Sequence, residues 1–205
     1  MARLLLVRHG ITDFNDARKF MGHSDIGMSD IGYRQIEKLR DRLMDRKIDA
    51  VYSSDLKRTL ETAELILAGR EIDVIPCPEL RECYYGECEG LTFQEIGSNY
   101  PDVAEKCINF TLELEFPEGE SFKDFIERAA GFLHRLEKHE QSDTILITSH
   151  SGPLKVLVLR LLGIDMNHWW QIRIDTASLS IVETYPRGAI LNVLNDTSHL
   201  VGIDK

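Results

Sequence analysis

The chain has 205 residues, of which 43% are hydrophobic and 28% are charged, and these proportions are ordinary for a globular protein. A formal net charge of −10 argues against a general surface for nucleic acid or for an anionic membrane. No apolar run approaches the length of a transmembrane helix, and the four cysteines lack the CxxC spacing of a zinc ribbon or a redox motif.

The N-terminus enters a predicted strand directly, without the longer apolar segment and cleavage site of a signal peptide. The simplest expectation is therefore a reduced, cytoplasmic protein that has neither nucleic acid nor a membrane as a partner. The sequence leaves open whether the protein forms a homodimer. No repeat, low-complexity segment or Pro/Gly/Ser-rich linker divides the chain, so a single domain over residues 1–205 is predicted.

The first predicted element is a short apolar run, Leu4 to Val7, which is typical of a strand in a sheet covered on both faces. The run stops at Arg8, His9 and Gly10, and such strand ends are where ligands bind in open α/β sheets. Taken alone, the histidine is equally well explained as a loop residue. The arginine favours a binding site, because a guanidinium that emerges from an apolar strand needs an anionic partner.

The next predicted elements alternate between helix and strand. Residues 19–30 read as a loop, and Ser29 is the predicted N-cap of a helix that runs to about residue 46. A short strand covers residues 50–53, and the helix after it, over residues 56–67, has Ser54 or Asp55 as its predicted cap. A third strand is suggested at residues 74–75, before an irregular functional loop over residues 79–90. A lid-like insertion is predicted around residues 83–116.

The second half of the chain completes the alternation. A helix is predicted from a capping box at Ser121 and Asp124 to about residue 139. An apolar strand over residues 144–148 ends near His150, and Pro153 fits the first turn of a helix that reaches residue 162. Two late strands, 178–185 and 190–194, suggest a hairpin. The pattern predicts an α/β fold: a three-layer α/β/α sandwich with a mainly parallel sheet and one antiparallel pairing.

Four segments resemble the signatures of the histidine phosphatase superfamily, which contains phosphoglycerate mutases and related phosphatases. In chain order they are Arg8 to Asn15, Ser53 to Ala63, Leu80 to Gly90 and Ser149 to Gly152. The resemblance covers nearly the whole chain. It implies a phosphoglycerate mutase-like fold.

The resemblance implies that His9 is phosphorylated during turnover, that Arg58 holds phosphate near a helix N-terminus, and that Glu82 is the proton donor. One ring nitrogen of His9 is expected to be oriented by a backbone acceptor, which leaves the other free to attack phosphorus. Arg8 supplies a positive charge beside it. A protonated His150, delivered to the same sheet edge, would stabilise the transferring oxygens.

Structural explanations compete with these roles. Arg58 would pair with Glu61 or Glu64 on an ordinary helix face, and Glu82 would pair with Arg81. The other histidines that we expect at the surface are His23, His134, His139 and His168. Their spacing does not indicate a metal site, so no metal and no cofactor are predicted.

The residues expected to bind substrate are Gly10, Thr12, Asn15, Met21, Gly22, Tyr85 and Ser151. The family usually has glycine directly after the second histidine, whereas this chain has Ser151 there and Gly152 next. The hydroxyl of Ser151 can donate a hydrogen bond where the family relies on close approach of the backbone. The aromatic residues that suit either the core or stacking on an aromatic leaving group are Tyr84, Tyr85, Trp169 and Trp170.

Three functions compete: a phosphatase, a mutase, and a non-catalytic interaction protein that keeps the fold. The presence of all five catalytic candidates disfavours the last. A mutase must retain a doubly anionic intermediate, but the segment from Leu91 to Phe116 has Lys106 as its only cation against five carboxylates. We therefore expect a metal-independent histidine acid-base phosphatase that hydrolyses a small phosphorylated metabolite. The length and the loop around Glu82 most resemble α-ribazole phosphatases and the small broad-specificity phosphatases near them.

Overall fold

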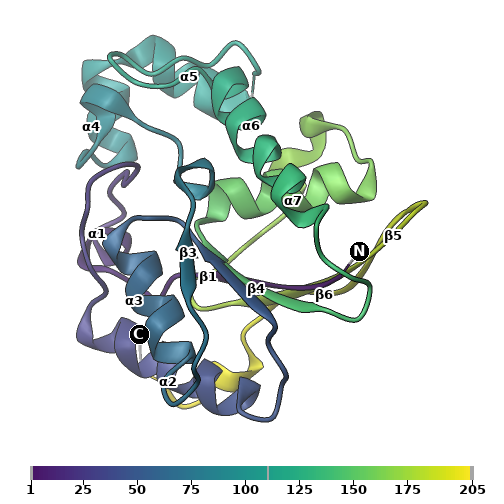
Figure 1. The fold of residues 1–205 in the computed structure, drawn as a ribbon. Coiled ribbons are helices and arrows are strands. Elements are labelled where there is room, and N and C mark those ends of the chain that lie inside the picture. Colours follow the sequence, from purple (N-terminus) through teal and green to yellow (C-terminus); the bar gives the residue numbers. More distant parts are fainter. Residues whose placement is uncertain (1, 110, 204–205) are drawn as a thin grey trace.

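A six-stranded sheet forms the middle layer of the fold (Figure 1). The computed structural model describes residues 2–109 and 111–203. The strands are β1 Arg3–Arg8, β2 Ala50–Ser53, β3 Val74–Pro76, β4 Thr144–Ser149, β5 Leu179–Tyr185 and β6 Gly188–Asp196. They lie in the order β3-β2-β4-β1-β5-β6.

Strands β3, β2, β4 and β1 run parallel, which confirms the mainly parallel sheet expected from the sequence. The sequence predicts one antiparallel pairing, but the structure has two, because β5 is antiparallel to both β1 and β6. Because a short turn joins β5 to β6, the pairing of these two strands has a local signal in the sequence. Strands β1 and β5 are far apart in the chain, and only the assembled sheet brings them together.

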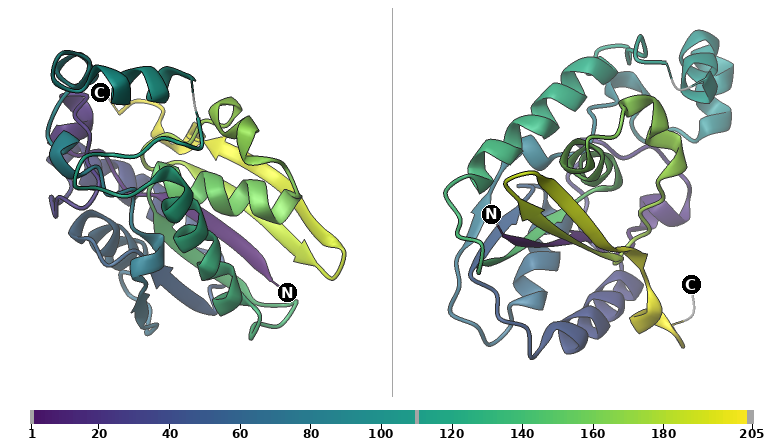
Figure 2. Two further views of the ribbon diagram at one scale, coloured as in Figure 1. Left: turned by 90° about the horizontal axis from the view of Figure 1, so that it is seen from above. Right: turned by 90° about the vertical axis from the view of Figure 1, so that its right-hand side faces the viewer.

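Helices cover both faces of the sheet (Figure 2). The α-helices are α1 Asp13–Asp16, α2 Asp30–Leu43, α3 Lys57–Ile66, α4 Phe93–Asn99, α5 Pro101–Asn109, α6 Phe122–Gly131 and α7 Ser151–Leu162. The short 3-10 helices are η1 Pro78–Leu80, η2 Gly86–Cys88, η3 Phe132–Leu136, η4 Met166–Gln171 and η5 Ser198–Leu200.

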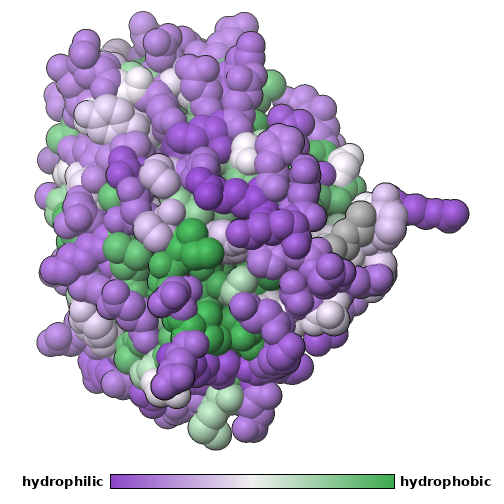
Figure 3. Space-filling model, viewed as in Figure 1, coloured by the Kyte–Doolittle hydropathy of each residue, from purple (hydrophilic) through white to green (hydrophobic). Residues whose placement is uncertain are grey.

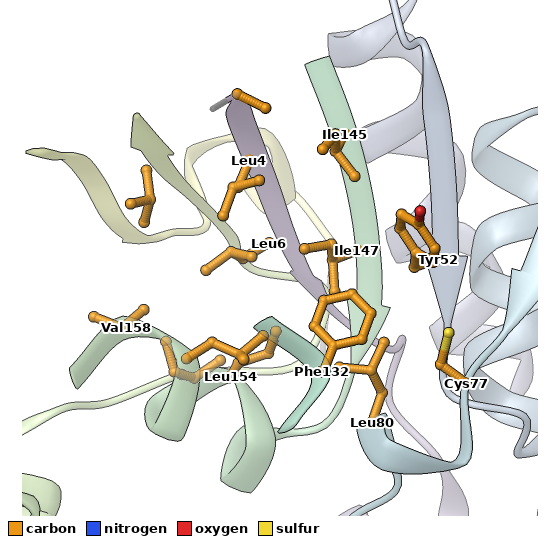
Figure 4. Close-up of a cluster of buried hydrophobic side chains, with 14 residues drawn as sticks. Leu4, Leu6, Tyr52, Cys77, Leu80, Phe132, Ile145, Ile147, Leu154 and Val158 are labelled. Atoms are coloured by element: carbon orange, nitrogen blue, oxygen red, sulfur yellow. The ribbon is translucent and has the colours of Figure 1, made fainter. Parts of the chain in front are cut away.

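The first strand shows why the sandwich forms. Side chains alternate between the two faces of a strand. Leu5 and Val7 pack in the cluster of α2 and α3, while Leu4 and Leu6 point to the opposite face, toward η3 and α7 (Figure 4). Each fully buried side chain of this size contributes about 1.5–3 kcal/mol to folding. Because both faces of β1 are apolar, both must be covered, and the predicted three-layer architecture is confirmed.

The predicted lid contains α4 and α5, which lie together at one end of the molecule (Figure 1). A capping box of Thr92 and Glu95 starts α4. Apolar side chains of the two helices, among them Ile96 and Val103, join a hydrophobic cluster. That cluster also contains Phe125 of α6 and residues of α7. Residue 110 of the predicted lid lies outside the described residues.

Two helix caps differ from the sequence prediction. Helix α3 has Leu56 at its N-cap position without a side-chain hydrogen bond, and Asp25 of a distant loop instead accepts the bond from the N–H of Lys57 at 2.6 Å. Neither Ser54 nor Asp55 caps the helix, because both side chains are engaged elsewhere, as described below. At α6, Ser121 accepts from the N–H of Asp124 at 3.1 Å, which is one half of the expected box.

Two helix ends also come earlier than the sequence predicts. Helix α2 ends at Leu43 rather than near residue 46. Helix α6 ends at Gly131 and continues as the tighter η3 to Leu136, rather than running to residue 139. Glycine disfavours a helix interior by about 1 kcal/mol, which explains the change at Gly131.

The face of the molecule in Figure 3 is mostly hydrophilic, and hydrophobic residues gather near its middle, where β3 lies in Figure 1. Strand β3 is an edge of the sheet, and its Val74 and Ile75 are only half-buried. Within residues 2–109 and 111–203, no helix is long and apolar enough to cross a membrane.

Candidate active site

The two histidines that follow β1 and β4 lie side by side. These strands are parallel neighbours in which Arg8 is paired with Ser149, so His9 and His150 leave the sheet at the same edge. Their ring centroids are 5.2 Å apart in an edge-to-face arrangement, and both side chains are buried. The prediction that the sheet delivers both imidazoles to one place is confirmed.

The ring of His9 is held by one hydrogen bond. Its Nδ1 lies 2.8 Å from the carbonyl oxygen of Gly10. A carbonyl only accepts, so Nδ1 carries the proton and the lone pair of Nε2 is free. Burial, together with the charges of Arg58 and Arg8, lowers the pKa of His9 well below its ordinary value. The imidazole is therefore neutral near pH 7, as a nucleophile must be.

Arg58 determines the charge of the second imidazole. Its Nε donates to Nδ1 of His150 at 3.2 Å, and Nε2 of that ring lies 2.9 Å from the hydroxyl of Ser54. A guanidinium has no acceptor, so Nδ1 of His150 is unprotonated. Burial and the charge of Arg58 also lower the pKa of His150 well below its ordinary value. The geometry therefore favours a neutral His150, contrary to the protonated form expected from the sequence.

The other donors of Arg58 bind the loop that precedes α2. They reach the carbonyl oxygens of Ser24 at 2.8 Å and Gly22 at 2.7 Å. The side chain is fully buried, and desolvation lowers its pKa to about 10. Its expected alternative partner Glu61 instead accepts from the backbone N–H of Met28 at 2.9 Å. Arg58 thus joins the loop to His150 and is not a solvated helix-face residue.

Arg8 has donors that remain available. One terminal nitrogen donates to the carbonyl oxygen of Ile174 at 2.8 Å, while the buried Nε has no partner. Within the described residues, no carboxylate lies at ion-pair distance from this guanidinium. A buried donor without a partner costs about 1–3 kcal/mol, which an oxygen of a bound ligand would offset. Arg8 lines the same cavity as His9.

Glu82 is positioned by two backbone groups. Its carboxylate accepts from the N–H of Cys83 at 3.0 Å and from the N–H of Gly152 at 3.1 Å. The alternative pairing with Arg81 is wrong, because that guanidinium binds Asp55 at 2.5 Å. Glu82 lines the cavity of His9.

Gly152 makes room for that carboxylate. A Cβ atom built on Gly152 would lie 2.0 Å from Oε1 of Glu82, closer than any real contact of this kind. The backbone at Gly152 therefore approaches the Glu82 carboxylate closely because this residue has no side chain. Ser151, which stands where the family usually has glycine, lines the cavity.

Replacing Gly152 by alanine is expected to lower kcat by about 10²-fold, because the new methyl group displaces Glu82, which the resemblance implies is the proton donor. The matched control is Gly131→Ala, since a Cβ at Gly131 meets nothing within 4 Å. Steady-state rates on a phosphomonoester with a poor leaving group measure the effect. Equal rates for both variants and the wild type would show that Glu82 does not need this clearance.

A half-buried arginine that the sequence does not mark as functional supports the Glu82 segment. Arg128 of α6 donates to the carbonyl oxygens of Arg81 at 2.9 Å and Glu82 at 3.0 Å, and it binds both carboxylate oxygens of Glu120. Glu120 in turn accepts from the N–H of Tyr84 at 2.9 Å. A local sequence signal for this clamp is lacking, because its members come from two separate segments.

The cavity at His9 has a volume of about 320 Å³. It is lined by Arg8, His9, Asn15, Arg18, Lys19, Phe20, Met21, Glu82, Tyr85 and Ser151. Asn15, Met21, Tyr85 and Ser151 are thus placed where the sequence predicts substrate contacts. The cations Arg18 and Lys19 also line it, although the sequence of the segment after α1 does not indicate which way that segment faces.

Three residues expected to bind substrate, Gly10, Thr12 and Gly22, do not line the cavity and instead support the structure around it. The N–H of Gly10 donates to the hydroxyl of Thr62 at 3.3 Å, so it does not point at a ligand. Thr12 is fully buried and caps α1. Gly22 offers its carbonyl to Arg58, as described above, and a Cβ there would meet the carbonyl oxygen of Cys83 at 2.1 Å.

Two of the histidines expected at the surface are not there. His23 is half-buried, with Nε2 at 3.1 Å from the carbonyl oxygen of Glu82, and burial lowers its pKa. His139 lies 2.9 Å from the hydroxyl of Tyr52 and its side chain is 11% exposed. His134 and His168 are exposed, as predicted. Hydrophilic sequence neighbours do not reveal such contacts with distant segments.

A second cavity, of about 260 Å³, adjoins the first. The two cavities share Phe20, Glu82, Tyr85 and Ser151. The further lining residues are Cys83, Cys107, Thr111, Leu114, Phe116, Phe122, Phe125, Gly152, Lys155 and Trp169. Of the aromatic residues left open by the sequence, Tyr85 and Trp169 line it, whereas Tyr84 and Trp170 are exposed.

Known proteins resemble this chain over nearly its whole length. The model of the histidine phosphatase superfamily (branch 1) matches residues 4–197. Phosphoserine phosphatase 1 of Hydrogenobacter thermophilus is 31% identical over 200 residues, which cover 98% of this chain and 95% of that protein. The adenosylcobalamin/alpha-ribazole phosphatase of Escherichia coli is 32% identical over 202 residues, 98% of each. The solved alpha-ribazole phosphatase of Shigella flexneri matches with a TM-score of 0.89 at 31% identity, covering 95% of this chain and 96% of that one.

Proposed function

Because the chain belongs to the histidine phosphatase superfamily, we propose that it hydrolyses a small phosphomonoester through a phosphohistidine on His9. The observation that carries the proposal is the free Nε2 lone pair of a buried, neutral His9 beside the unpartnered donor of Arg8. A nucleophile and a cation for the phosphoryl oxygens are thus at one place.

Two steps complete the reaction. In the first, Nε2 of His9 attacks phosphorus, the bond to the ester oxygen breaks, and Glu82 gives its proton to the leaving alcohol. In the second, Glu82 takes a proton from water as that water attacks the phosphoimidazole, which releases inorganic phosphate and restores His9. Arg8 stabilises the phosphoryl oxygens in both steps. Neither step uses a metal ion. We therefore expect the rate of hydrolysis to be unchanged when a chelator is added.

The relatives suggest the first substrates to test. Their names give phosphoserine and α-ribazole phosphate as substrates of those proteins. Of the relatives' substrates, we propose α-ribazole 5′-phosphate as the first to test, because aromatic side chains such as Tyr85 and Trp169 line the cavity next to Glu82. A panel that adds phosphoserine, sugar phosphates and 3-phosphoglycerate measures the preference.

A mutase is the second candidate, and one observation favours it. Arg18 and Lys19 line the cavity of His9 and could receive a second phosphate. The predicted lid opposes this function, since Lys106 is the only cation from Leu91 to Phe116. A second phosphate adds roughly two negative charges, each of which needs a partner once water is excluded.

The decisive assay follows 3-phosphoglycerate by phosphorus NMR with a trace of 2,3-bisphosphoglycerate. We expect inorganic phosphate to form, no stimulation by the bisphosphate and negligible 2-phosphoglycerate, because water has better access than a second phosphate. If 2-phosphoglycerate accumulates faster than inorganic phosphate, the protein is a mutase rather than a phosphatase.

A further inference from the structure

The second cavity, beside Glu82, contains one cation. Lys155 of α7 lines it and lies with its Nζ 5.0 Å from the centre of the Trp169 ring. Within the described residues, we find neither a hydrogen bond nor an ion pair for this ammonium. Burial lowers its pKa from the ordinary value, although the residue is only half-buried. Apart from the Trp169 ring, this half-buried ammonium has no partner in the described part of the chain, so it can bind an anion in the cavity.

The remaining walls of this cavity are mainly apolar. They include the rings of Phe116, Phe122 and Trp169. One further polar atom is unpartnered: the hydroxyl oxygen of Thr111 is buried without a hydrogen bond. The volume of about 260 Å³ exceeds the roughly 150 Å³ of an apolar cavity that binds benzene, so one substituted ring fits.

The cavity continues from the place where the ester bond breaks. Glu82, the proposed acid, lines both cavities, and so do Tyr85 and Ser151. When the phosphoryl group is at His9 and the ester oxygen is at Glu82, the carbon skeleton of the alcohol therefore extends into the second cavity. This orientation rests on the proposed function.

We propose that the second cavity selects a leaving alcohol that carries an apolar ring and one carboxylate, and that Lys155 binds this carboxylate. A single ammonium matches one negative charge, whereas a second phosphate would bring about two. A neutral aromatic alcohol such as α-ribazole would fill the ring site and leave the ammonium without an anion. The inference therefore ranks an aromatic ester that carries a carboxylate above α-ribazole 5′-phosphate as a substrate. Lys155 is then a specificity-determining residue, separate from the groups that act on phosphorus.

The test compares two substrates of nearly equal shape, 4-carboxybenzyl phosphate and 4-carbamoylbenzyl phosphate. A charged pair is stronger than a neutral hydrogen bond, so the wild type should favour the carboxylate by about tenfold in kcat/KM. Lys155→Met should remove the preference and Lys155→Arg should keep most of it. Lys106→Met, which removes an exposed lysine of the lid, is the matched control and should change nothing.

The ratio of the two substrates separates recognition from a general electrostatic effect. The charge of Lys155 also acts on Glu82, and that effect alters both substrates equally. Equal kcat/KM for both substrates in the wild type would overturn the inference.

Binding tests the inference without turnover. Calorimetry on His9→Ala should show tighter binding of the carboxylate ester, and the further change Lys155→Met should abolish the difference. If the wild type hydrolyses neither ester but this difference in binding appears, the proposed reaction fails and the inference about Lys155 stands. Equal affinities for the two esters would overturn the inference, whatever the wild type hydrolyses.

Discussion

Replacing His9 by alanine is expected to lower turnover by about 10⁴-fold or more while the protein keeps its fold. The reason is that Nε2 of His9 carries the free lone pair of a neutral imidazole. This residue is buried at the end of β1. Incubation of the wild type with a labelled phosphomonoester should give a phosphoenzyme that is stable in alkali and labile in acid, as a phosphoimidazole is. His9→Ala should give none.

The matched control for this variant is His134→Ala, because His134 is exposed and lies in η3, on a different element from the site. Circular dichroism and thermal unfolding check that both variants are folded. Substantial turnover by a correctly folded His9→Ala protein would exclude His9 as the nucleophile. Label on His9→Ala would place the phosphoryl group on another residue.

The second large effect concerns Glu82. Glu82→Gln should slow hydrolysis of an alkyl phosphate by about 10²–10⁴-fold, because the alkoxide cannot leave without a proton. p-Nitrophenolate leaves unprotonated, so the loss in the phosphorylation step should be much smaller with p-nitrophenyl phosphate. Glutamine keeps the size of the side chain, so one of the two backbone N–H groups that bind the carboxylate retains an acceptor.

Single-turnover measurements of the phosphorylation step separate this effect from hydrolysis of the phosphoenzyme. Glu87→Gln is the matched control, since Glu87 is exposed and accepts from the hydroxyl of Tyr100 at 3.0 Å. If Glu82→Gln slows phosphorylation equally with both substrates, Glu82 is not the acid for the leaving group. Glu89 is unsuitable as a control, because its carboxylate holds the backbone of His23 and Ser24.

Composition alone does not distinguish which of several neighbouring carboxylates is the candidate proton donor. Glu82, Glu87 and Glu89 occur within one short segment. The resemblance favours Glu82, and the structure places it, unlike Glu87 and Glu89, in the wall of the His9 cavity. The difference is made by Gly152, whose missing side chain admits the carboxylate. That clearance joins two segments distant in the chain, so it has no local sequence signal.

Local sequence patterns were sufficient to predict the layers of the fold. The apolar runs at β1 and β4 and the periodic apolar residues of α2 predict elements that must bury their faces, and burial of both faces of a strand requires helices on each side. The same runs end at His9 and His150, so parallel neighbours bring these residues together. The side-chain period and strand direction are properties of the backbone, which is why the sequence alone determined them.

The tertiary structure decided the chemistry of the side chains. Arg58 makes Nδ1 of His150 an acceptor and so favours a neutral imidazole, and the clamp of Arg128 holds the segment of Glu82. The available cations also depend on packing: Arg18 and Lys19 line the cavity of His9, and Lys155 faces the second cavity. Protonation and ligand contacts depend on distances and burial between residues far apart in the chain, and only the folded chain sets these.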